Sequence, residues 1–76
     1  MATIYTYNTL GENVKKLRES KNLTQMQLAV MAGISQSYLS YVELGLRQIT
    51  VQILCNLCNV LECTPDDLLE QKEVSI

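Results

Sequence analysis

The sequence predicts an all-α domain built from five short helices. Three observations carry this prediction: apolar residues recur at spacings of three and four, hydroxyl residues precede each apolar stripe, and Asn or Gly follows three of the stripes. The chain has 76 residues, of which 47% are hydrophobic and 18% charged, a composition typical of a folded protein. A chain this short holds one small core and often needs stabilisation by disulfides, a metal or oligomerisation.

The first helix is expected to run from Thr9 to about Lys21. Thr9 and Glu12 have the spacing of a capping box. Asn22 can adopt the left-handed conformation that ends a helix. One face of this helix carries its apolar residues, which recur at four and three: Leu10, Val14 and Leu17.

Two further helices are expected with a tight turn between them. Thr24 and Gln27 form a second capping box, Gly33 permits the turn, Ser35 caps the next helix and Gly45 ends it. Two capped helices joined by a short turn that contains a glycine make a helix-turn-helix. Its inward-facing residues are expected to be Leu28, Ala29, Ala32, Ile34, Leu39 and Val42.

A fourth and a fifth helix complete the domain. Thr50 is expected to cap the fourth, and Thr64 the fifth, in which Pro65 occupies the first helical position. Asp66 and Asp67 follow at the positive end of that helix dipole. The fourth helix is expected to be the most buried, and the inward residues of the two helices are Ile53, Leu54, Leu57, Cys58, Leu61, Leu68 and Leu69.

The two ends of the chain differ from the helical part. Residues 1–8 are rich in β-branched and aromatic types and are expected to form an arm or a strand. A single strand has no partner in an otherwise helical monomer, so three roles stay open: a disordered arm, pairing with the same segment of another subunit, or packing across a neighbour. The expected organisation is therefore an arm at 1–8, a helical domain at 9–71 and a tail at 72–76.

Several classes of protein are disfavoured by composition. No stretch approaches the roughly 18 apolar residues of a membrane span, and the first residues do not resemble a secretion signal, so a cytoplasmic protein without membrane contact is expected. Three cysteines cannot all pair, and we expect reduced thiols that fill apolar space. The chain has no His, so no enzyme, metal or cofactor is expected. A metal or redox sensor built on Cys55, Cys58 and Cys63 is the disfavoured rival.

Charge is unevenly distributed along the chain. The net charge of −2 argues against nucleic acid as a partner, because phosphate contacts supply most nonspecific affinity. Residues 1–51, however, carry five basic and three acidic side chains, whereas residues 52–76 carry one and five. Only the basic part is expected to meet nucleic acid.

The outward side of the predicted third helix carries Gln36, Ser37, Ser40 and Tyr41. These side chains suit the edges of bases in a major groove: Gln can form two hydrogen bonds to adenine, Ser can donate or accept, and an aromatic ring can contact a thymine methyl group. We expect these four residues to contact DNA bases. For Tyr41 a packing role is the alternative.

The chain resembles the lambda repressor and Cro-like helix-turn-helix family over about residues 9–70. The matching residues are Leu17, Arg18, Leu23, Thr24, Gln25, Leu28, Ala29, Gly33, Ile34, Ser35, Ser40, Val42, Glu43, Gly45, Arg47, Thr64, Pro65, Leu68 and Leu69. The resemblance implies a compact five-helix domain that binds a double-stranded DNA operator with its third helix. The expected function is that of a transcriptional regulator, and specifically a repressor.

The resemblance also implies roles for residues outside the third helix's outward side. Gln25, with the neighbouring Thr24, is expected to contact phosphate at the start of the second helix, where backbone N–H groups add donors. Further phosphate contacts are expected from Arg47, Gln48 and Tyr38, although Tyr38 is equally compatible with packing. Arg18 and Glu43 are expected to form a structural ion pair that ties the first helix to the end of the third.

Apolar residues stand where relatives often have polar ones: Met26, Val30, Leu44, Leu46, Cys55 and Val60. A monomer rarely exposes a large apolar patch, so these residues indicate an interface. We expect a homodimer that reads a pseudo-palindrome with half-sites about 34 Å apart. The alternative is a protein-binding regulator, an antitoxin or antirepressor that uses the same scaffold to hold a partner protein.

Overall fold

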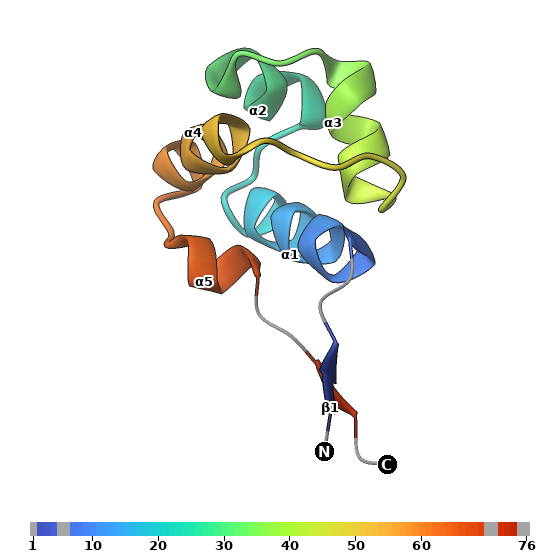
Figure 1. Cartoon of the computed structure of the whole chain (residues 1–76). Helices are drawn as coiled ribbons and strands as arrows, with labels where there is room; N and C mark the ends of the chain where they lie inside the picture. The colour runs from blue at the N-terminus through green and yellow to red at the C-terminus, as the bar shows by residue number, and fades with distance from the viewer. Residues whose placement is uncertain (1, 5–6, 70–71, 75–76) are drawn as a thin grey trace.

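The computed structural model describes residues 2–4, 7–69 and 72–74 (Figure 1). The five expected helices are present, and two three-residue strands accompany them. In chain order the elements are β1 (Ala2–Ile4), α1 (Tyr7–Ser20), α2 (Gln25–Ala32), α3 (Gln36–Glu43), α4 (Val51–Leu61), α5 (Pro65–Leu68) and β2 (Lys72–Val74). None of the described helices is long and apolar enough to cross a membrane.

Helix α1 begins earlier than the sequence predicts. The expected capping box at Thr9 is wrong, because the helix starts at Tyr7 and both Thr9 and Glu12 lie inside it. No proline or glycine stands between Tyr7 and Thr9, so nothing in the local chemistry stops the helix from extending upstream. The other end agrees with the prediction, since Asn22 has a left-handed φ of 59° just after the helix.

The hydroxyl caps of the four later helices are confirmed. In each case the side-chain oxygen accepts a hydrogen bond from the backbone N–H three residues further on, at Thr24, Ser35, Thr50 and Thr64. Gly33 ends α2 with a φ of 74°, a conformation that L side chains rarely adopt. The helices α2 and α3 are therefore joined by a turn that local sequence determines.

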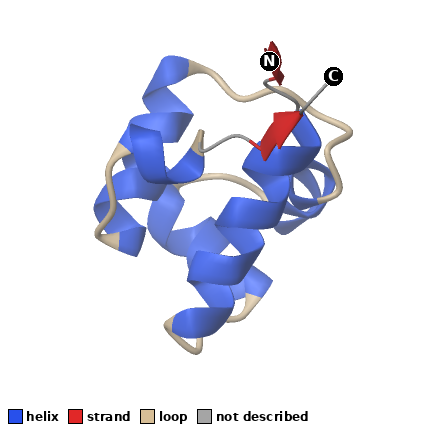
Figure 2. Cartoon of the chain, turned by 90° about the horizontal axis from the view of Figure 1, so that it is seen from below, coloured by secondary structure: helices blue, strands red, loops and turns tan. Residues whose placement is uncertain are grey.

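Figure 2 shows the arrangement of the helices from below. Within the described part of the chain, they enclose one hydrophobic core. The buried hydrophobic residues are Leu10, Val14, Leu28, Ala29, Ala32, Leu39, Val42, Leu57, Cys58, Leu61 and Leu68. Two expectations were wrong here. Leu69 is 38% exposed because α5 ends at Leu68 and turns the next side chain outward. Val60, expected to be exposed, is half-buried because it packs against the core from α4.

One glycine sets the approach of α1 to α3. A Cβ atom on Gly11 would lie 2.3 Å from the carbonyl oxygen of Val42 and 2.7 Å from that of Glu43. Real Cβ atoms do not come this close to backbone oxygens. The absence of a side chain at Gly11 therefore lets the middle of α1 lie directly against the end of α3.

The two ends of the chain pair with each other. Strands β1 and β2 are antiparallel, with Ala2 opposite Val74, Thr3 opposite Glu73 and Ile4 opposite Lys72. The expectation that an N-terminal strand lacks a partner within the chain was wrong. Residues 72–74 include a Lys and a Glu, types with low strand propensity, so no sequence signal marked the second strand. Figure 1 shows the paired strands at the opposite end of the molecule from α2 and α3.

Candidate nucleic-acid interface

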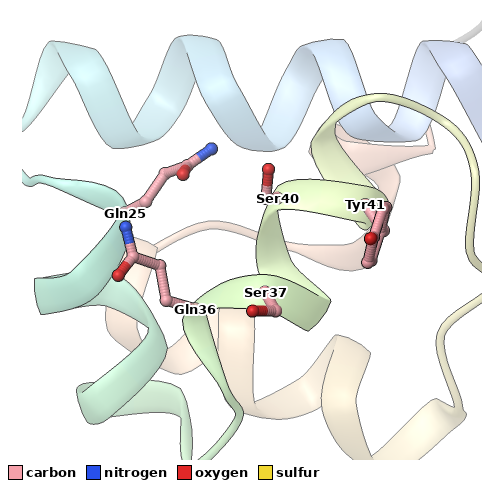
Figure 3. A pocket seen from close by; sticks show the side chains of 5 residues that line it. All are labelled: Gln25, Gln36, Ser37, Ser40 and Tyr41. Atoms are coloured by element: carbon pink, nitrogen blue, oxygen red, sulfur yellow. The ribbon is translucent and has the colours of Figure 1, made fainter.

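An open hollow lies on the outer surface of α2 and α3 (Figure 3). Five residues line it: Gln25 from the start of α2, and Gln36, Ser37, Ser40 and Tyr41 from α3. Figure 3 shows Gln25 and Gln36 at one end of the hollow and Tyr41 at the other. The hollow thus gathers the four residues expected to contact bases and one of those expected to contact phosphate.

The helical repeat explains which of these side chains project. In α3 the positions 36, 37, 40 and 41 share one side, while Leu39, Val42 and Glu43 face inward and are buried. Gln36, Ser37 and Tyr41 are exposed, whereas Ser40 and Gln25 are half-buried at the edge nearer the core. The side of α3 that is open to a ligand therefore carries one amide, one hydroxyl and one phenol.

Behind the hollow lies a buried ion pair between Arg18 of α1 and Glu43 of α3. The distance from Nε of Arg18 to Oε2 of Glu43 is 2.7 Å, and from Nη2 to Oε1 it is 3.0 Å. A third guanidinium nitrogen donates to the carbonyl oxygen of Leu23 at 2.9 Å. The hydrogen bond to Glu43 raises the pKa of Arg18 above its ordinary value. The two residues of this pair, and the two helices that it joins, are those that the family resemblance implies.

The same carboxylate also holds Gln25. The side-chain Nε2 of Gln25 donates to Oε1 of Glu43 at 3.0 Å. This bond uses one of the two amide N–H donors and leaves the other donor and the amide oxygen for a ligand. Sequence reasoning missed this contact, because 18 residues separate the partners and only the packing of α2 against α3 brings them together. Glu43, the acidic group next to the hollow, is neutralised by Arg18.

The remaining predicted site residues lie outside the hollow. Thr24 uses its hydroxyl in the α2 capping box, where it accepts from the backbone N–H of Gln27. Tyr38 is half-buried, and its hydroxyl donates to the carbonyl oxygen of Gln48 in the segment after α3. Arg47 and Gln48 are exposed in that segment. Their expected phosphate contacts stay predictions.

A cation–π contact at the edge of the hollow was also missed by sequence reasoning. The guanidinium carbon of Arg47 lies 5.6 Å from the centre of the Tyr41 ring, within the range of such contacts. The two residues are six apart, which is not a spacing that brings side chains together on a helix. The turn after α3 brings the two side chains together. The feature of the sequence that indicates this contact is therefore Gly45, which forms the turn.

The cysteines show no metal-site geometry in the described part of the chain. Within residues 2–4, 7–69 and 72–74, no group of three or more Cys, His, Asp or Glu side chains could hold a metal ion. Cys55 is exposed, Cys58 buried and Cys63 half-buried, and all three are free thiols. Burial, with a smaller effect of the neighbouring Cys63, raises the pKa of Cys58 to about 11. Burial also raises the pKa of Cys63.

The fold and this surface define a helix-turn-helix domain of the lambda repressor type. The helix-turn-helix family model matches residues 14–68, which is most of the chain and includes all of α2, α3 and α4. This chain therefore belongs to the helix-turn-helix family, in its lambda repressor and Cro-like branch. The predicted all-α, lambda-repressor-like fold is confirmed.

The chain is similar to a protein named as a transcriptional regulator and to one named as an antitoxin. YqaE of Bacillus subtilis, named as an HTH-type transcriptional regulator, is 39% identical over 60 residues, which are 79% of this chain and 52% of YqaE. Antitoxin PezA of Streptococcus pneumoniae is 28% identical over 65 residues, 86% of this chain and 41% of PezA. The chain thus spans about half the length of these two relatives or less.

Solved structures agree over most of the domain. The restriction-modification controller protein C.AhdI from Aeromonas hydrophila has a TM-score of 0.79 and 31% identity, over 82% of this chain and 94% of C.AhdI. SinR, described as the master regulator for biofilm formation and solved in complex with DNA, has a TM-score of 0.77 and 32% identity. That match covers 80% of this chain and 98% of the SinR chain.

Proposed function

We propose that this chain is a sequence-specific double-stranded DNA-binding transcriptional regulator, and specifically a repressor, that reads the major groove with α3. The observation that carries the proposal is the outer side of α3, where Gln36, Ser37 and Tyr41 are exposed together beside a shared hollow. Their amide and hydroxyl groups can donate to and accept from base edges. The family membership and the SinR–DNA complex support the same function.

In this proposal, different residues of this surface contact the bases and the phosphates. Bases are contacted by the α3 residues Gln36, Ser37, Ser40 and Tyr41, with Ser40 at the less exposed edge. Gln25 and Thr24 contact phosphate at the start of α2, where the free N–H groups of the first turn favour an anion. Arg47 and Gln48 in the segment after α3, and Tyr38 on α3 itself, supply the other phosphate contacts. Base contacts specify the sequence, and phosphate contacts set the orientation.

The functional unit is a cytoplasmic, non-enzymatic homodimer that binds a pseudo-palindromic operator. Exposed apolar side chains support a protein interface on the described surface: Met26, Val30, Met31, Leu44, Leu46 and Val51, with the exposed thiol of Cys55. Sedimentation velocity across a range of micromolar concentrations tests the dimer. A protein that stays monomeric throughout and binds a single half-site with full affinity would contradict it.

Selection of bound sequences from a random duplex pool tests the proposed function. We expect the wild type to enrich a motif with two-fold symmetry. Selection with Gln36→Ala should relax the preference at one position in each half-site, because one bidentate base contact is lost. Asn59→Ala, at an exposed position of α4 outside the hollow, is the matched control and should enrich the wild-type motif. Failure of the wild type to enrich any sequence would disprove the proposal.

A protein-binding regulator is the second candidate. The exposed side of α2 carries Met26, Val30 and Met31, which are unusual on a helix surface in contact with water. The similarity to the antitoxin PezA supports this candidate, and it is compatible with DNA binding. Capture of a single stoichiometric partner from the native host by the wild type, but not by Met26→Lys/Val30→Lys, would favour it.

A further inference from the structure

The segment that follows α3 is fixed to that helix by its backbone. Gly45 has a φ of 78°, and its N–H donates to the carbonyl oxygen of Val42 at 3.0 Å. The N–H of Leu46 donates to the carbonyl oxygen of Tyr41 at 2.8 Å. These two bonds form a Schellman motif, which reverses the chain and directs it back along α3. Arg47 is the next residue.

The same segment is held a second time just after Arg47. The hydroxyl of Tyr38, one turn before Tyr41 on α3, donates to the carbonyl oxygen of Gln48. Arg47 therefore has a backbone anchor on each side, at Leu46 and at Gln48. In both hydrogen bonds the partner is an α3 residue, Tyr41 or Tyr38, so the backbone of Arg47 is held in a fixed position relative to that helix.

The side chain of Arg47 is directed by the Tyr41 ring. Its guanidinium carbon lies 5.6 Å from the ring centre, while Arg47 is exposed and Tyr41 is 46% exposed. The ring thus orients the cation without burying it. Among the described residues the ion pairs are Arg18–Glu43 and Lys21–Glu62, so no carboxylate there competes for Arg47.

We propose that Tyr41 is a positioning residue for Arg47: its ring holds the guanidinium at the edge of the α3 hollow, ready to contact a phosphate of the bound duplex. This inference rests on the proposed function and deepens it, because it gives Tyr41 a role besides base contact. Pre-orientation matters because a long, freely rotating Arg side chain loses conformational freedom when it binds. The anchored segment and the ring remove part of that loss before DNA arrives.

The geometry can be tested without DNA. Aromatic ring currents shift nearby protons, so the Arg47 side-chain protons should resonate upfield in the wild type and in Tyr41→Phe. In Tyr41→Leu and in Tyr41→Gln they should return to ordinary positions, because neither variant has a ring. Ordinary Arg47 shifts in the wild type and in Tyr41→Phe, or an upfield shift that survives removal of the ring, would overturn the proposal. Tyr41 is exposed, and two different replacements guard against a variant that fails to fold.

A double-mutant cycle on DNA tests the function of the contact. On random duplex, where base contacts contribute little, we expect Tyr41→Phe to bind within about twofold of the wild type because it keeps the ring. Tyr41→Leu should lose about three- to tenfold there, since phosphate contacts ignore sequence. In the Arg47→Ala background the same Tyr41→Leu change should cost little on random duplex, because its partner is already absent. The slope of log K against log salt should fall by about one in Arg47→Ala.

The outcomes separate this inference from the proposed function. If Tyr41→Leu costs the same on random duplex with and without Arg47, or weakens the operator complex alone, Tyr41 does not act through Arg47 and the inference is wrong while DNA binding stands. If the wild type binds no duplex, the proposed function fails, and the inference about phosphate fails with it even where the ring-current shifts are present.

Discussion

Arg18 and Glu43 meet in a two-pronged ion pair that joins the end of α1 to the end of α3. Both residues are only 8% exposed, and their nitrogen–oxygen distances are 2.7 and 3.0 Å. The carboxylate also accepts from Gln25, and the guanidinium also donates to the carbonyl of Leu23. The pair therefore ties α1 to both helices of the helix-turn-helix, to α3 through Glu43 and to the start of α2 through Gln25.

Removal of one partner of this pair should strongly destabilise the folded protein. Glu43→Ala leaves the Arg18 cation buried without its acceptor and should reduce the free energy of unfolding by about 3–5 kcal/mol, measured by urea denaturation. The double variant Arg18→Met/Glu43→Leu removes both charges and should be less destabilised than Glu43→Ala. Equal losses in the single and the double variant would show that packing volume, rather than the unpaired charge, sets the cost.

Gly11→Ala should destabilise the protein although Ala favours helices. The added Cβ would lie 2.3 Å from the carbonyl oxygen of Val42, so α1 must move away from α3. We expect a loss of about 1–3 kcal/mol from overpacking, against a helix-propensity gain of about 0.5–1 kcal/mol. Thermal and urea unfolding measure the net effect.

Gly33 supplies the control for this prediction. A Cβ on Gly33 meets nothing within 4 Å, so its requirement is the left-handed backbone alone. Asn tolerates that conformation, so Gly33→Asn should be milder than Gly33→Ala. At Gly11 the larger Asn side chain should be worse than Ala. The opposite order at Gly11 would mean that space does not limit this position.

The buried thiol of Cys58 should make stability depend on alkaline pH. Its pKa is raised from 9.0 to about 11 in the folded protein, so the folded state keeps a proton that the unfolded chain loses above pH 9. This contribution is complete below pH 9 and is lost as the pH rises through 11. The free energy of unfolding should fall by about 1–2 kcal/mol over that range.

Comparison with Cys58→Ala isolates this effect from the other ionisable groups of the chain. Both proteins share those groups, so the difference between their slopes of unfolding free energy against pH belongs to the thiol. The variant's curve should be flatter between pH 9 and 11. Parallel curves would show that Cys58 has the same pKa in the folded and unfolded chain.

The three thiols should react in a definite order. Cys55 is exposed, whereas burial raises the pKa of both Cys58 and Cys63 and lowers the thiolate fraction that reacts. At neutral pH, and at a concentration where the protein is monomeric, an aromatic disulfide reagent should modify one thiol of the folded protein quickly and the other two only on unfolding. Cys55→Ser should abolish the fast phase. A fast phase that persists in this variant would contradict the assigned burial.

The base-contact and phosphate-contact residues should give separable binding defects. Gln36→Ala should cost about 1–3 kcal/mol on the operator and little on random duplex. Arg47→Ala should weaken both complexes and lower the salt dependence. Lys16→Ala is the matched cation control, since Lys16 lies on α1 and lines a different hollow, which Asn13, Leu17 and Asp67 also line. Fluorescence anisotropy at several salt concentrations measures all three, and equal losses on every sequence from Gln36→Ala would contradict its role.

Helix positions and turns followed from local chemistry. The ends of a helix depend on residues within a few positions of one another. A capping residue in the β-conformation precedes the helix, and a left-handed residue can follow it. The roles of Thr24, Gly33, Ser35 and Thr50 could therefore be predicted directly. The start of α1 could not, because a Thr acts as a cap only if the residues before it leave the helix. The pairing of β1 with β2 was also hidden, since one of the strands carries no strand-like pattern.

Helical periodicity and caps are encoded within about one turn, so the five helices, the helix-turn-helix and the outward side of α3 could be predicted from local sequence. The organisation of that surface depends on the packing of the helices: Gln25 is bound to Glu43, Arg47 lies over Tyr41, and Gly11 is in contact with the end of α3. These relationships join residues on different elements or across a chain reversal. Their distances depend on how whole helices pack, which no local pattern specifies.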